Sequence, residues 1–180
     1  MTHSIREART GELQQLLDVH RAAFGQTDEA NLVRDLLDDP TAQPCLSLVA
    51  TQGEQVIGHI LFTVIRIEGS GLIASILCPL AVLPQLHRQG IGKALIETGL
   101  QHLRTQGCDL VFVLGDPAYY GQFGFREADF DRLPTPQPIP DHYRPGWMVQ
   151  SISDKSVDAE SRRLVCADAL NRPEFWSDGP

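Results

Sequence analysis

Gly90 and Gly92, two glycines separated by one residue, follow an apolar segment and precede a stretch in which apolar residues recur at helical spacing. The first N–H groups of a helix lie at the positive end of its dipole, and glycine lets an anion approach the main chain. Arg88 and Lys93 add positive charge, and residues 69–96 contain no Asp or Glu. This pattern indicates a phosphate site, although the same glycines could instead serve close packing of a helix on a sheet.

Two other phosphate-binding patterns are absent. The dinucleotide fingerprint needs Gly-x-Gly-x-x-Gly, but its third glycine position is Leu95 here, and the Walker A pattern does not occur. The segments before the loop also have the character of antiparallel strands, whereas both of those patterns belong to parallel units. The sequence therefore disfavours NAD and ATP as ligands.

Hydrophobic spacing predicts the elements that must position this loop. Apolar residues recur at helical spacing in some segments and form short strand-like runs in others. In chain order we expect helices between Thr10 and Phe24 and from about residue 28 to Pro40, strands at 45–51, 55–67 and 71–83, a helix at 90–106, a strand at 110–114, a short helix from Pro117 and a strand at 147–152. This order predicts an α/β fold with a mixed, largely antiparallel sheet.

Two segments do not fit a regular element. Residues 133–145 are interrupted by Pro134, Pro136, Pro138, Pro140 and Pro145. This composition favours an extended loop, a candidate lid. The chain from residue 153 is polar until Phe175-Trp176, whose rings would either dock on the body or fray. We therefore expect a domain over residues 1–152 and a C-terminal tail over 153–180.

Composition excludes several classes of protein. The chain has 180 residues, 42% hydrophobic and 21% charged, and a formal net charge of -8. These values fit a single domain and disfavour nucleic acid and anionic membrane surfaces as partners. No apolar run reaches the roughly 18 residues of a membrane span, and the N-terminus lacks the core of a signal peptide. The four cysteines are widely spaced, so we expect no metal site and a reducing, cytoplasmic compartment.

Two motifs resemble the GCN5-related N-acetyltransferase (GNAT) superfamily. Its pyrophosphate loop, Gln/Arg-x-x-Gly-x-Gly/Ala, is similar to residues 87–92, where His87 takes the first position. Pro79-Leu80-Ala81-Val82 and the segment 111–125 resemble its YhbS-like branch. The resemblance covers roughly residues 4–152, which would then be an N-acetyltransferase domain. It implies the GNAT-like acyl-CoA N-acyltransferase fold, with a sheet flanked by helices and splayed central strands.

The resemblance implies acetyl-CoA as the co-substrate. The pantetheine arm would lie between the fourth and fifth strands, and the pyrophosphate would rest on N–H groups of the loop. The residues that it implies for cofactor binding are Leu80, Ala81, Val82, Arg88, Gln89, Gly90, Ile91, Gly92, Lys93 and Ala94. A highly anionic ligand would thus occupy the stretch without carboxylates, which is electrostatically favourable.

The implied reaction is direct attack of a primary amine, on a small molecule or a peptide, on the thioester. An amine with a pKa near 10.4 is neutral in about one part in a few thousand at pH 7, so the neutral form costs roughly 4–5 kcal/mol. Tyr120 matches the family tyrosine that can protonate the CoA sulfur. Candidates for the base are Asp116, which also suits a helix cap before Pro117, and His59, whose strand neighbours also suggest a structural histidine. Deprotonation by water is the other alternative.

A non-catalytic acyl-CoA-binding or regulatory module with the same fold is the alternative function, because His87 and the uncertain base leave turnover open. We expect Tyr119 and Cys78 to pack rather than react. The acceptor should enter beside the first two helices and the proline-rich loop. The acidic residues from Asp35 to Asp39 hint at a cationic acceptor, but a solvated helix face also explains them. The sequence is compatible with a homodimer.

Overall fold

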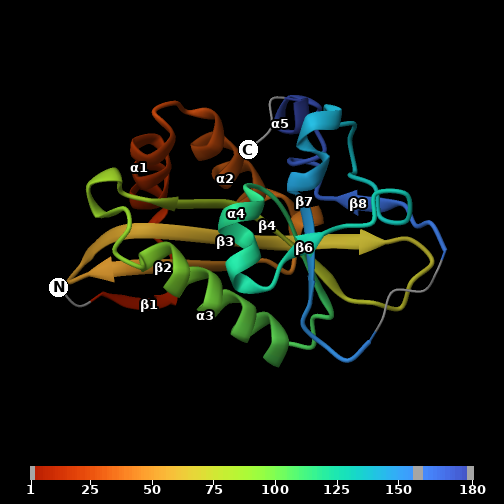
Figure 1. Cartoon of the computed structure of the whole chain (residues 1–180). Helices are drawn as coiled ribbons and strands as arrows, with labels where there is room; N and C mark the ends of the chain where they lie inside the picture. Colours follow the sequence, from red (N-terminus) through yellow and green to blue (C-terminus); the bar gives the residue numbers. More distant parts are fainter. Residues whose placement is uncertain (1–2, 156–159, 178–180) are drawn as a thin grey trace.

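An eight-stranded sheet organises the chain, and helices cover both of its faces (Figure 1). The computed structural model describes residues 3–155 and 160–177. Its helices and strands are β1 (Ser4–Glu7), α1 (Leu13–Phe24), α2 (Asp28–Asp38), β2 (Leu46–Gln52), β3 (Gln55–Ile67), β4 (Ala74–Val82), α3 (Ile91–Thr105), β5 (Leu110–Leu114), α4 (Pro117–Tyr120), β6 (Arg126–Glu127), β7 (Trp147–Ser151), β8 (Leu164–Cys166) and α5 (Glu174–Ser177). No helix in these ranges is long and apolar enough to cross a bilayer.

The sheet is mixed and largely antiparallel, as the sequence predicts. Its strand order is β1-β2-β3-β4-β5-β7-β6, and β8 pairs with the end of β3. Among the strands of the described residues, only β4 and β5 run parallel, and the crossover through α3 joins them. Helix α3 packs on one face, and α1 and α2 pack on the other.

The two parallel strands separate after three residue pairs. Ala74 to Ile76 lie opposite Leu110 to Phe112, and no later residue of β4 pairs with β5. The register between β3 and β4 also shifts, so that Cys78 and Pro79 bulge out of the ladder. Pro79 has no N–H to donate to a neighbouring strand, which suits this position. The central strands are therefore splayed, and the opening between them faces the start of α3.

The C-terminal part of the chain returns to the core. Trp176 is buried against Trp147, with ring centroids 5.9 Å apart. Its indole Nε1 donates a hydrogen bond to the carbonyl oxygen of Leu170 at 2.8 Å. Complete burial of a large apolar side chain contributes about 1.5–3 kcal/mol, enough to hold a short terminal segment in place. Residues 156–159 and 178–180 of the tail that begins at residue 153 lie outside the described residues.

Some details differ from the sequence expectations. The first helix begins at Leu13, so Thr10 is not its N-cap; Glu12 takes that place without a side-chain cap. Glu12 instead accepts hydrogen bonds from Arg6 at 2.6 and 2.9 Å. Strands β1 and β8 were not expected, because four and three residues are too few to show a clear alternation.

Candidate functional site

Two cavities meet where β4 and β5 separate. The loop cavity, of about 480 Å³, is lined by Leu80, Val82, Leu86, His87, Arg88, Gly90, Ile91, Gly92, Lys93, Tyr119 and Tyr120. The central cavity, of about 520 Å³, is lined by Phe24, Gln26, Glu29, Leu32, Ile76 to Leu80, Val113 to Asp116, Tyr120, Leu170, Phe175 and Trp176. They share Leu80 and Tyr120. A molecule lying in the loop cavity can therefore present one end to the central cavity at these two residues.

The backbone of the loop has an unusual conformation. Arg88 has φ = 61° and Gly90 has φ = 81°, so both lie in the left-handed region. For a residue other than glycine this costs on the order of 1–3 kcal/mol, and it persists where the surroundings hold it. Turns that include left-handed residues can gather successive N–H groups into an anion-binding nest. Because α3 begins directly after Gly90, its first N–H groups belong to the same concave site.

Tyr120 is fixed tightly at the junction of the cavities. Gly115 leaves space for its ring, because a Cβ on Gly115 would overlap the aromatic carbons of Tyr120. Phe125 packs edge-on against the ring at 5.8 Å between centroids. Burial raises the pKa of Tyr120, and Tyr119 and Cys78 raise it further. Its hydroxyl therefore keeps its proton and can act as a donor.

The sequence and the fold match one family. The acetyltransferase (GNAT) domain model matches residues 4–128. The chain belongs to the GNAT N-acetyltransferase family. It is 40% identical over 160 residues to the uncharacterized N-acetyltransferase YjhQ of Escherichia coli (strain K12), covering 87% of this chain and 88% of YjhQ. It is also 40% identical over 153 residues to the N-acetyltransferase YhbS of the same strain, covering 84% and 89%.

Solved GNAT structures have the same architecture. The crystal structure of E. coli YhbS in complex with CoA has a TM-score of 0.83 and 30% identity, over 94% of this chain and 92% of that one. The structure of a GNAT family acetyltransferase from Brucella melitensis in complex with acetyl-CoA has a TM-score of 0.74 and 28% identity, over 94% and 98%. The predicted fold and family are thereby confirmed.

Most residues implied for cofactor binding lie together. Of the ten, seven line the loop cavity: Leu80, Val82, Arg88, Gly90, Ile91, Gly92 and Lys93. Ala81 alternates to the other face of β4 and is buried among α1 side chains, while Gln89 and Ala94 do not line the cavity. His87 does line it, and its Nε2 donates to the carbonyl oxygen of Val82 at 2.9 Å. The atypical His87 thus ties the loop back to the end of β4.

Tyr119 and Tyr120 both line the loop cavity, although we expected Tyr119 only to pack. Tyr119 does pack against Phe123, with ring centroids 5.4 Å apart, but it also lines the loop cavity. Its hydroxyl lies over Gly92, where a Cβ would come within 2.6 Å of the oxygen. No periodicity signals this placement, because a four-residue helix is too short to define a face.

The two candidate bases occupy different environments. Asp116 lines the central cavity and also caps α4, its Oδ1 accepting from the Ala118 N–H at 2.9 Å. His59 is fully buried and lines neither cavity. Its Nδ1 shares a hydrogen bond with His20 Nε2 at 2.8 Å, and its Nε2 shares one with Ser47 Oγ at 2.9 Å. The geometry therefore favours the structural alternative for His59.

The central cavity is mostly apolar; its wall from the first two helices was expected, whereas its wall from the C-terminal segment was not. Helices α1 and α2 contribute Phe24, Glu29 and Leu32, and the turn between them contributes Gln26. The C-terminal segment contributes Leu170, Phe175 and Trp176. The proline-rich residues 134–145 were expected beside the acceptor, but none of them lines this cavity. Burial, with smaller effects of Cys166 and Glu29, raises the pKa of the Cys78 thiol to about 12. Cys78 therefore remains a neutral thiol, as expected.

Two of the acidic residues from Asp35 to Asp39 have structural partners. Asp35 pairs with Arg172 at 2.9 Å, and Asp39 accepts from the Ala169 N–H at 2.8 Å. These contacts hold the C-terminal segment on α2. They do not support the earlier hint that this acidic cluster attracts a cationic acceptor. Within the described residues, no group of three or more His, Cys, Asp or Glu side chains is arranged to hold a metal ion.

Proposed function

We propose that the chain transfers the acetyl group of acetyl-CoA directly to a primary amine. The observation that carries this proposal is the junction of the loop cavity and the central cavity at Leu80 and Tyr120. A donor seated in the first cavity and an acceptor seated in the second would meet there. CoA and acetyl-CoA in the related E. coli and B. melitensis structures support the choice of donor.

The pyrophosphate of CoA would bind the N–H groups from Arg88 to Lys93. The left-handed residues of this loop and the start of α3 support such a site. The pantetheine arm would lie along β4 beyond Ile76, where β5 no longer pairs with it. The main chain of Leu80, Ala81 and Val82 could then pair with the pantetheine amides.

Transfer needs no enzyme-bound intermediate. The neutral amine nitrogen attacks the thioester carbonyl and forms the new N–C bond, and collapse of the tetrahedral intermediate breaks the C–S bond. Tyr120 gives its proton to the departing sulfur and is reprotonated from the nitrogen through solvent. The products are the N-acetyl amine, CoA as a thiol, and one proton that the initial ammonium group releases to solvent.

Calorimetric titration with acetyl-CoA and detection of free CoA thiol across a panel of amines test the proposal. We expect binding, and amine-dependent thiol release with one acetamide formed per CoA. Binding without thiol release for any amine would favour the non-catalytic acyl-CoA-binding module. Absence of acetyl-CoA binding would exclude both.

A further inference from the structure

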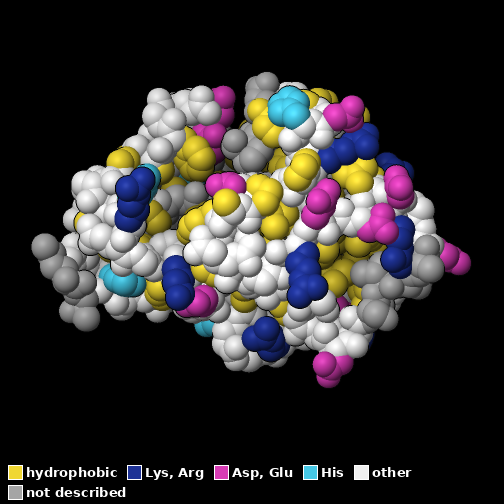
Figure 2. Space-filling view, viewed as in Figure 1, with side chains coloured by type: hydrophobic (Ala, Val, Ile, Leu, Met, Phe, Trp, Pro, Cys, Tyr) yellow, Lys and Arg dark blue, Asp and Glu magenta, His cyan; other side chains and the backbone are white. Residues whose placement is uncertain are grey.

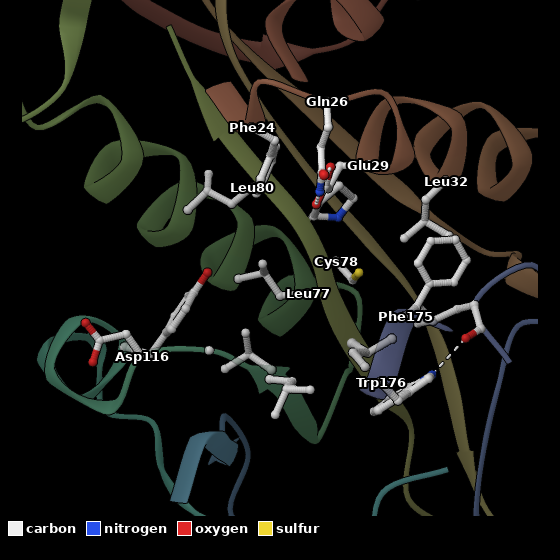
Figure 3. Close-up of a pocket in the computed structure, with 17 residues that line it drawn as sticks. Phe24, Gln26, Glu29, Leu32, Leu77, Cys78, Leu80, Asp116, Phe175 and Trp176 are labelled. Carbon is white, nitrogen blue, oxygen red and sulfur yellow. Dashed lines mark hydrogen bonds between the residues drawn. The ribbon is translucent and has the colours of Figure 1, made fainter. Parts of the chain in front are cut away.

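We infer that the central cavity selects a hydrophobic primary amine: Glu29 attracts its ammonium group before that group loses its proton and reacts at the junction, and the C-terminal segment packs against its apolar body. This inference rests on the proposed function, because it assigns the acceptor to the cavity beyond Tyr120. It concerns a residue and a wall that the family motifs do not include. Figure 3 shows Glu29 on one side of this cavity and Asp116 on another, with Leu77 and Cys78 between them.

Glu29 is a carboxylate without a cationic partner among the described residues. It lies in the first turn of α2, is partly buried, and lines the central cavity. Its Oε1 and Oε2 accept from Gln26 Nε2 at 3.1 and 3.3 Å. Within the ranges that the structure covers, no ion pair is formed by Glu29 or by Asp116. A cationic ligand would therefore find an unneutralised negative charge on this wall.

An acidic first turn has a simpler explanation, because carboxylates there stabilise a helix through its dipole. Asp28 fits that explanation fully: it is exposed and does not line the cavity. Glu29 differs, since its charge lies near enough to Cys78 to contribute to the raised pKa of that thiol. Cys78 in turn contributes to the raised pKa of Tyr120. Glu29, Cys78 and Tyr120 all line the central cavity.

The remaining wall is suited to an apolar body. Phe175 and Trp176 come from the C-terminal segment and lie across the cavity from Glu29 in Figure 3. Arg172 holds this wall in place: it pairs with Asp35, and its guanidinium lies 4.9 Å from the centroid of the Phe175 ring. In the space-filling view, hydrophobic side chains gather over α4 and between the first helices and α5 (Figure 2). A volume of about 520 Å³ falls in the range of sites for small organic ligands.

The charges of the cavity also exclude a class of acceptor. A carboxylate on the acceptor would share the cavity with the carboxylates of Glu29 and Asp116, and like charges brought close together repel. A zwitterionic amino acid should thus be a poor substrate even when its side chain fits. The three amines 2-phenylethylamine, phenylalanine and ethylamine separate these effects, because the second adds a carboxylate and the third lacks the ring.

The experiment measures initial rates of thiol release with acetyl-CoA and each of the three amines, and calorimetric binding of 2-phenylethylamine to the complex with CoA. We expect kcat/KM for 2-phenylethylamine to exceed that for either other amine by at least about tenfold. Glu29→Gln should raise its KM by about tenfold or more and leave acetyl-CoA affinity unchanged. Asp28→Asn is the matched control, because it removes the same charge from the same helix turn; its KM should stay near that of the wild type.

Phe175→Ala tests the apolar wall separately. It should raise the KM for 2-phenylethylamine but not the KM for ethylamine. Three results would each overturn the inference. They are equal changes of KM in Glu29→Gln and Asp28→Asn, a kcat/KM for phenylalanine comparable to that for 2-phenylethylamine, and no binding of 2-phenylethylamine to the CoA complex. If acetyl-CoA turns over with other amines independently of Glu29, only this inference fails. If acetyl-CoA does not bind at all, the proposed function fails with it.

Discussion

The hydroxyl oxygen of Tyr119 occupies the space above Gly92 where a side chain would begin. A Cβ on Gly92 would lie 2.6 Å from that oxygen but 3.9 Å from Cζ of the same ring. The hydroxyl group alone therefore creates the close contact, and the ring behind it is at an ordinary packing distance. Tyr119 thus makes the identity of Gly92 a matter of local packing as well as of access for a phosphate.

Gly92→Ala should raise the Kd for CoA by about tenfold or more, because the methyl group forces Tyr119 to move across the loop cavity. The double variant Gly92→Ala/Tyr119→Phe removes the contact while it keeps the methyl group. We expect it to recover thermal stability but only part of the affinity. Titration calorimetry and thermal unfolding check this. If the double variant bound CoA as well as the wild type, the methyl group itself would not obstruct the anion.

Tyr120→Phe should lower kcat by about tenfold to a hundredfold. This is a small effect for the loss of a general acid, because a thiolate is already a moderate leaving group without protonation. The Kd for acetyl-CoA should change little, since the ring and its contact with Phe125 remain. Stopped assays of thiol release give the rate. Tyr143 lines neither cavity, so Tyr143→Phe is the matched control. Unaltered turnover in Tyr120→Phe would exclude the proton-donor role.

The buried pair His20 and His59 should make the protein sensitive to mild acid. Burial lowers the pKa of His20 to about 4, and burial together with His20 lowers the pKa of His59 well below its ordinary value. The unfolded chain takes up these protons near pH 6.5 while the folded chain does not, so stability is full above that pH and falls below it. For His20 alone the loss is about 2 kcal/mol by pH 5.

Urea unfolding at pH 8 and pH 5 measures this difference. His20→Gln should reduce it, whereas His102→Gln is the control, because it replaces a partly exposed histidine outside the buried pair. Glu12, whose pKa Arg6 lowers to about 2, loses its contribution only as the pH falls from about 4.5 towards 2. The loss of stability between pH 6.5 and 5 is therefore attributed to the buried histidines. If His20→Gln lost as much stability between pH 8 and pH 5 as the wild type, the prediction would be contradicted.

Local patterns predicted most of the fold and indicated the residues on the loop side of the candidate site. The loop at 87–92 directly follows its strand, and Tyr120 lies in a second local motif, so each could be found from a short stretch of sequence. The wall formed by Phe175 and Trp176 depends on the contact of Arg172 with Asp35, which are 137 positions apart. Such a pairing leaves no local periodicity. Glu29 was likewise hidden, because an acidic residue in the first turn of a helix is expected on other grounds.

The left-handed backbone of Arg88 separates two ways in which the loop could bind an anion. Arg88→Gly removes the guanidinium but adopts φ near 60° without strain, whereas Arg88→Val removes it and resists that conformation. If the main-chain N–H groups carry the binding, Arg88→Gly should raise the Kd for CoA by less than about tenfold, and Arg88→Val should raise it several times more. Titration calorimetry at fixed ionic strength compares the two, with circular dichroism to verify folding. Equal losses in both variants would mean that the charged side chain, and not the conformation that it adopts, provides the attraction.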